Sequence, residues 1–135
     1  MLGRILLTFD SLNLLLGAWV MDFNSESHIF NPNWPPHAKF HCGQTITLST
    51  ALGFATLFLT WRSWFQPGTS KVVLQDSMKI AAFTGSIYWI AGLASILFPG
   101  SAGLDPEFGG PGFPQLPLFT VLATCALLGS WWESL

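Results

Sequence analysis

The residues with the greatest chemical potential lie in one short stretch of this sequence. Residues 28–41 read HIFNPNWPPHAKFH and contain all three histidines of the chain. Because imidazole changes protonation near neutral pH, histidine serves as a general acid, a general base or a metal ligand. Polar side chains are scarce elsewhere, so this stretch is the first candidate for a functional site.

The two histidines His37 and His41 are four residues apart and follow Pro35-Pro36. Proline suits the first positions of a helix, because a helix start leaves those N–H groups unpaired anyway. A helix that begins here places both imidazoles on one face. Three interpretations are open: an acid/base pair, a metal site, and interfacial histidines bonded to lipid headgroups or loop backbone. Acid/base chemistry is favoured and no metal is expected, because no HExxH motif or carboxylate at matching spacing is present.

Further candidates surround this stretch. Asp22 is expected to orient an imidazole or act as a base, the alternative being a simple charge where the chain leaves the membrane. His28 is expected on the same side of the membrane as His37 and His41. The predicted catalytic cluster is therefore Asp22, His28, His37 and His41. The predicted substrate contacts are Asn24, Asn31, Trp34, Gln44 and Tyr88. Asn31 and its neighbour Asn33 are equally ordinary turn residues. Asp105 and Glu107, in a later loop, are expected to be solvated acids, with a lid over the site as the alternative.

Asp10 is the one acidic residue inside a predicted span. An ionisable group at that depth is costly and indicates a function by default. Two roles are open: a buried neutral acid that acts as a further catalytic proton donor, and a structural hydrogen bond to a Thr, a Ser or Tyr88 of another helix. Asn13 and Gly17 follow along the same helical face, which predicts a polar strip facing the bundle interior.

The composition is that of a membrane protein. Half of the 135 residues are hydrophobic and 9% are charged, against about a quarter charged in a soluble domain. The mean hydropathy is +0.49. A net charge of −2 offers no basic patch, so nucleic acid is not an expected partner. Cys42 and Cys125 are expected to be buried thiols. No phosphate loop, haem motif or dinucleotide fingerprint is present, so no cofactor is expected.

Four apolar segments must position these residues. Each is about 17–20 residues long, which is the length that crosses a hydrocarbon core as a helix. The prediction is one all-α domain, residues 1–135, folded as an integral membrane four-helix bundle. The segments are Ile5–Met21, Cys42–Trp61, Ile80–Phe98 and Leu116–Trp132.

The distribution of charge predicts an orientation. Cytoplasmic loops of membrane proteins carry an excess of Lys and Arg. Four of the five cations fall on the side of the termini: Arg4, Arg62, Lys71 and Lys79. Both termini are therefore expected in the cytosol and the histidine loop in the lumen, in a protein of the endoplasmic reticulum.

The pattern DxNxxSHxxNPxWPPHAKFH, residues 22–41, resembles the signature of a family of small four-span membrane proteins found in fungi and some bacteria. In size and layout the chain is also similar to membrane epoxide hydrolases and cyclases of fungal polyketide pathways, of the aurovertin and citreoviridin type. The resemblance is strong in the first loop, residues 22–41, and weak in the third and fourth spans. It implies that Asp22, His28, His37 and His41 occupy active-site positions and that Asp10 lies outside the motif.

The function expected is therefore a cofactor-independent membrane hydrolase or cyclase of secondary metabolite biosynthesis. It would open an epoxide on a lipophilic polyketide-type intermediate, with an acid at the epoxide oxygen and a base on the attacking water or hydroxyl. An isomerase or terpene-type cyclase is one alternative, and a non-catalytic lipid- or sterol-binding membrane protein is another. The expected partners are a lipophilic small molecule and membrane lipid, and homo-oligomerisation is left open.

Overall fold

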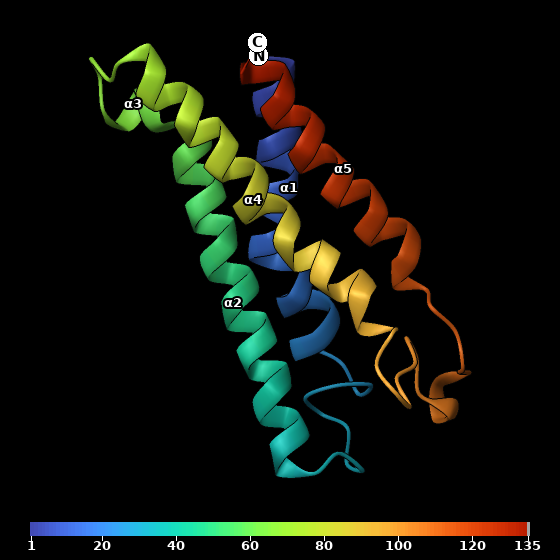
Figure 1. The fold of residues 1–135 in the computed structure, drawn as a ribbon. Helices are drawn as coiled ribbons and strands as arrows, with labels where there is room; N and C mark the ends of the chain where they lie inside the picture. Colours follow the sequence, from blue (N-terminus) through green and yellow to red (C-terminus); the bar gives the residue numbers. More distant parts are fainter. Residues whose placement is uncertain (135) are drawn as a thin grey trace.

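The computed structural model describes residues 1–134, and over that range it contains helices and loops but no strand (Figure 1). The all-α prediction is confirmed. The long helices are α1 (Leu2–Ala18), α2 (Pro36–Thr60), α4 (Lys71–Ser95) and α5 (Gln115–Ser134). Three short elements join them: the π-helical turn η1 (Trp19–Phe23), α3 (Arg62–Phe65) and the 3₁₀ turn η2 (Pro106–Phe108).

Local sequence explains where two of these helices begin and end. Pro35 is the N-cap of α2 and Pro36 its first residue, as the Pro-Pro pair predicted. Helix α4 begins after Ser70, whose Oγ accepts a hydrogen bond from the Val73 N–H at 3.4 Å. It ends at Ser95, so the predicted span to residue 98 was too long at that end. Pro99 follows, and the residue before a proline disfavours helical backbone.

Three helical segments are long and apolar enough to cross a membrane: Leu2–Phe23, Pro36–Thr60 and Gln115–Ser134. Helix α4 is as long as α2, at 25 residues, but is not among them. Length and composition therefore support a membrane protein and identify three of the four predicted spans.

The long helices form a bundle in which α1 packs on α2 and α5, and α4 packs on the same two helices. Both termini lie at one end of the bundle, together with α3 (Figure 1). The loop after η1 and the loop that carries η2 lie together at the opposite end. In a bundle of four spans these two loops lie on the same side of the membrane, and in the structure they share one end of the molecule.

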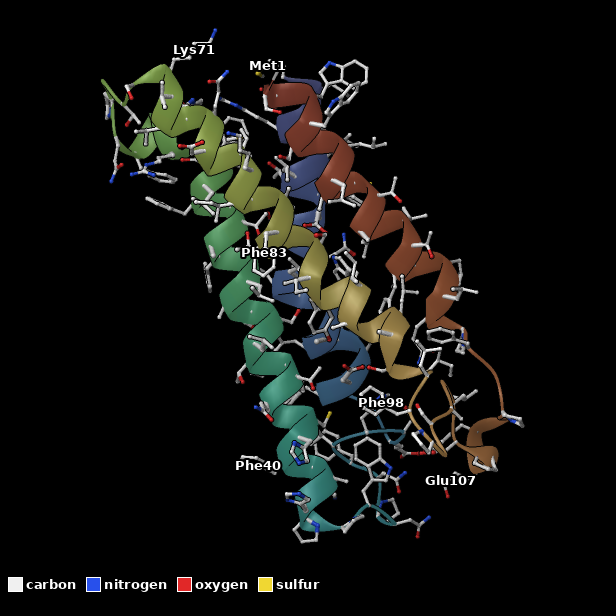
Figure 2. The ribbon with its side chains drawn as sticks, viewed as in Figure 1. Met1, Phe40, Lys71, Phe83, Phe98 and Glu107 are labelled. Carbon is white, nitrogen blue, oxygen red and sulfur yellow. The ribbon has the colours of Figure 1, made fainter. Side chains whose placement is uncertain are left out.

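The interior of the bundle combines large apolar side chains, such as Leu14 and Leu122, with small and hydroxyl residues. Ser49 of α2 donates to the Leu14 carbonyl of α1 at 2.7 Å, and Ser130 of α5 donates to the Met78 carbonyl of α4 at 2.6 Å. Large apolar side chains such as Phe83, 61% exposed, cover the outside (Figure 2). Close packing through small residues, with apolar groups outward, is typical of helices in lipid.

Candidate active site

A pocket of about 540 Å³ lies between α2 and α4, at the loop end of the bundle. Its walls are mostly apolar, with Leu48 and Leu52 from α2, Ile87 from α4 and Phe119 from α5. The loop that carries η2 also borders it. The pocket therefore combines side chains from three long helices with the loops that connect them.

The lining of this pocket includes the ionisable side chains of Asp22, His28 and Asp105, of which Asp22 and His28 lie side by side. The Asp22 Oδ1 atom lies 3.7 Å from the His28 Nε2 atom, and both side chains are partly buried. On its other side, His28 Nδ1 is 2.8 Å from the Ser27 hydroxyl, which is 2.6 Å from the Ser25 hydroxyl. Asp22 was expected to lie beside an imidazole, and in the structure that imidazole belongs to His28. Ser27 was not among the predicted site residues, although its hydroxyl contacts His28.

The position of Asp22 depends on the π-helical turn η1. The Asn24 N–H donates to the Trp19 carbonyl five residues earlier, at 3.3 Å. The extra residue per turn rotates the following side chains relative to a continued α-helix, and such turns often occur at functional sites. Backbone contact continues into the loop, where the Ile29 N–H donates to the Asp22 carbonyl at 3.4 Å. The loop therefore folds back and places His28 beside Asp22.

His37 and His41 do not line this pocket. They lie on one face of α2, as predicted from their spacing, with their Nε2 atoms 3.0 Å apart and both side chains exposed. The first loop instead packs on the face of α2 that carries Cys42 and Ile46. The expected cluster is thus split into two groups, because the loop and the histidine pair occupy different faces of the same helix.

The predicted substrate contacts are also divided. Trp34 and Tyr88 line the pocket, and the Trp34 ring lies edge-on to the His28 ring at 5.4 Å. Asn24 and Gln44 are exposed and lie outside the lining. Asn31 is 1% exposed, and its side chain donates a hydrogen bond to Glu107 of the other loop.

The two loops are joined by a carboxylate–amide clamp. Glu107 accepts hydrogen bonds from Asn31 Nδ2 at 2.8 Å and from Asn33 Nδ2 at 2.9 Å, one on each carboxylate oxygen. Asp105 accepts a longer bond from Trp34 Nε1, at 3.4 Å. Asp105 and Glu107 are exposed, as expected of solvated loop acids, but their carboxylates also accept hydrogen bonds from the first loop. These acids hold the Asn-Pro-Asn-Trp segment beside the pocket.

Asp10 lies in the bundle interior and not in the pocket lining. It is fully buried, and its Oδ1 atom accepts a hydrogen bond from Trp89 Nε1 at 2.7 Å. For a structural role, the expected hydrogen-bond partner of Asp10 was a Thr, a Ser or Tyr88. The donor in the structure is Trp89, the residue that follows Tyr88 in the sequence. No residue described here donates to the Asp10 Oδ2 atom, which occupies space left by Gly85, where a Cβ would lie 2.6 Å away.

The predicted polar strip beyond Asp10 is wrong. Asn13 donates to the Phe9 carbonyl of its own helix at 2.9 Å, in an exposed position. Ser11 is the polar neighbour that is buried instead, and it donates to the Leu7 carbonyl. The buried face of α1 is set by its packing on α2 and α5, which periodicity alone did not reveal.

Gln115 is a pocket residue that sequence reasoning missed. Its Nε2 donates to the Gly103 carbonyl at 2.6 Å, which ties the start of α5 to the loop. Its Oε1 has no partner among the described residues. The residue lies beyond a long Gly/Pro-rich stretch, so no spacing rule linked it to the histidine loop.

No group of three or more His, Cys, Asp or Glu side chains within residues 1–134 is placed to hold a metal ion. The polar side chains that line the candidate site include the carboxylates of Asp22 and Asp105, the His28 imidazole and the Ser27 hydroxyl, beside an apolar volume.

The fold and site together define a small helical protein with membrane-type spans and an acid/base pocket between them. The chain belongs to DUF6640, a family of unknown function, whose profile matches residues 8–132. That range includes both loops and every residue of the pocket. No curated protein and no solved structure matches the chain.

Proposed function

We propose that this protein is a membrane-bound enzyme that opens an epoxide on a lipophilic, polyketide-type substrate by general acid/base catalysis. The observation that carries the proposal is the Asp22–His28 pair at the edge of a mostly apolar pocket. A carboxylate and an imidazole supply a base and an acid without a cofactor. The reaction is suggested by the similarity of the chain, in size and layout, to membrane epoxide hydrolases and cyclases of fungal polyketide pathways.

The proposal includes a fourth span and an orientation. Helix α4 has the length of α2 and packs between α2 and α5, so we place it across the bilayer with them. The excess of Lys and Arg at the end that carries the termini favours the cytosol there. The pocket then opens near the lumenal face of an internal membrane, the endoplasmic reticulum.

The proposed reaction balances with these two residues. Protonated His28 donates its Nε2 proton to the epoxide oxygen as the carbon–oxygen bond breaks. The Asp22 carboxylate accepts a proton from water, whose oxygen forms the new bond to carbon. The product is a diol, and transfer of the proton from Asp22 to His28 restores both groups. An internal hydroxyl of the substrate in place of water gives a cyclic ether.

The surroundings of the pair suit this chemistry. The Ser27 hydroxyl at His28 Nδ1 accepts a hydrogen bond from the imidazolium and fixes the ring orientation. The apolar walls from α2 and α4 accommodate a hydrocarbon chain. A lipophilic epoxide partitions into the bilayer, so we propose that it enters sideways, between these two helices.

A second candidate is an isomerase or terpene-type cyclase. It is favoured by the aromatic rings of Trp34, Tyr88 and Phe119 around the same volume. The faces of such rings stabilise positive charge. In that reaction protonated His28 would protonate an alkene or epoxide, and the rings would shield the resulting cation.

The test is turnover of a long-chain polyene epoxide by purified protein in lipid nanodiscs, in H₂¹⁸O. Diol carrying one ¹⁸O is expected, and Asp22→Asn or His28→Gln should lower the rate about 10²–10⁴-fold. Glu26→Gln, an exposed acid of the same loop, is the matched control and should retain activity. Binding with no turnover in the native protein would support a lipid-binding protein instead. An isomer without ¹⁸O would support the cyclase.

A further inference from the structure

We propose that His37 and His41 form a bidentate binding site for a divalent transition-metal ion of the zinc and copper class. The pair lies on the outer face of α2, outside the Asp22–His28 pocket. The proposal rests on its own geometry and does not depend on the proposed enzymatic function.

The two ring nitrogens share a hydrogen bond, and a metal ion would replace the shared proton at a similar separation. Their Nε2 atoms are 3.0 Å apart. A tetrahedral zinc ion with two bonds of about 2.0–2.1 Å holds its nitrogen ligands about 3.3 Å apart. A small rotation of either ring closes that difference. The imidazole planes are inclined at 77°, and the ring centroids are 4.4 Å apart.

Gln44 selects the protonation of His41 that a metal needs. The Gln44 Oε1 atom lies 3.2 Å from His41 Nδ1, where it accepts that N–H. In the neutral ring this leaves the lone pair on Nε2, which accepts the hydrogen bond from His37 Nε2–H. A metal ion bound by both rings takes the place of that His37 proton. Histidines that bind metals usually donate their other ring N–H to such a partner, which fixes the tautomer and the ring orientation.

The backbone and a neighbouring ring hold the pair in place. Both histidines lie within the regular helix that begins at Pro36. The Phe40 ring is stacked parallel to the His37 ring at 6.2 Å and meets the His41 ring edge-on at 5.5 Å. Both imidazoles are exposed, so an ion can enter and its remaining positions stay open to water or to a ligand from another molecule.

The ligand type predicts which ions bind. Imidazole suits zinc, copper and nickel, whereas magnesium and calcium prefer oxygen ligands. Copper(II) should therefore bind more tightly than zinc, and magnesium should not compete. Binding should weaken as the pH falls, because a protonated imidazole has no lone pair to offer.

The experiment is a titration of metal-stripped, tag-free protein in detergent with Zn²⁺ by calorimetry, and with Cu²⁺ by electron paramagnetic resonance. We expect nitrogen hyperfine coupling from two imidazoles. His37→Ala and His41→Ala should each remove the second imidazole from the spectrum. Gln44→Ala should weaken zinc binding about 10–100-fold, as is typical when a partner of a metal ligand is lost. His28→Ala is the matched control and should bind as the native protein does.

The outcomes separate clearly. One ion per chain, or one ion shared by two chains, with dependence on both His37 and His41 supports the site. Absence of binding, binding unchanged in both alanine variants, or loss of binding in His28→Ala overturns it. Circular dichroism confirms that each variant is folded. Because the readout is metal affinity, failure here leaves the epoxide proposal untouched, and failure of turnover leaves this site untouched.

Discussion

Removal of the Glu107 carboxylate should release the two loops beside the pocket. In Glu107→Ala both hydrogen bonds to the amides of Asn31 and Asn33 are lost. Glu107→Gln keeps the shape but offers one acceptor oxygen, so it should retain one bond. Glu26→Gln is the matched control, because Glu26 is an exposed acid of the same end of the molecule.

The size of the effect follows from the two contacts. A hydrogen bond to a charged group contributes about 1.5–3 kcal/mol when protected from water. The Asn31 bond is partly buried, so we take about 1.5 kcal/mol for it. The Asn33 bond is exposed, and its value falls to about 0.5 kcal/mol. The alanine variant should therefore lose about 2 kcal/mol, a change of about 30-fold in the loop-opening equilibrium. The glutamine variant should lose about 0.5 kcal/mol with the Asn33 bond and about 0.5 kcal/mol more because its bond to Asn31 is neutral, which is about 1 kcal/mol or 5-fold in total.

Hydrogen exchange read by mass spectrometry measures this opening directly. Peptides covering residues 25–35 and 101–110 should exchange about 30-fold faster in Glu107→Ala and about 5-fold faster in Glu107→Gln. Peptides from the middle of α2 and α5 should not change. Unaltered exchange of both loops in the alanine variant, or equal acceleration in Glu26→Gln, would refute the assignment of Glu107 as the clamp.

Three further predictions concern the interior and the topology. Gly85→Ala places a Cβ 2.6 Å from Asp10 Oδ2 and should lower the free energy of unfolding by about 1–3 kcal/mol. Gly43 has open space around it, so Gly43→Ala should raise the free energy of unfolding by about 0.5–1 kcal/mol. Unfolding in detergent measures both changes. Asp10→Asn keeps an oxygen acceptor for the Trp89 indole, whereas Asp10→Ala leaves the indole unpaired and should cost about 1–3 kcal/mol more in the same assay. With Cys42 and Cys125 replaced by serine, single cysteines introduced at residues 25 and 70 should be labelled from opposite sides of the membrane. Labelling of both from one side would contradict a spanning α2.

Local patterns in the sequence determined the helices. The four apolar runs predicted four long helices. A segment that crosses the hydrocarbon core must satisfy its own backbone hydrogen bonds, and a helix does this whatever the neighbouring segments do. The Pro35-Pro36 pair gave the start of α2, and the four-residue spacing gave the shared face of His37 and His41. These features depend on contacts within one turn of chain, which sequence spacing describes fully.

Only the tertiary structure decided which polar groups meet. The π-helical turn and the folded-back loop bring His28 to Asp22 while leaving His37 and His41 on another face of α2. The Glu107 clamp joins residues more than seventy positions apart. The rotation of α1 about its axis directs Asp10 toward Trp89. Each outcome depends on the path of a loop or the angle of a helix, and these are set by packing between segments, which no short-range pattern records.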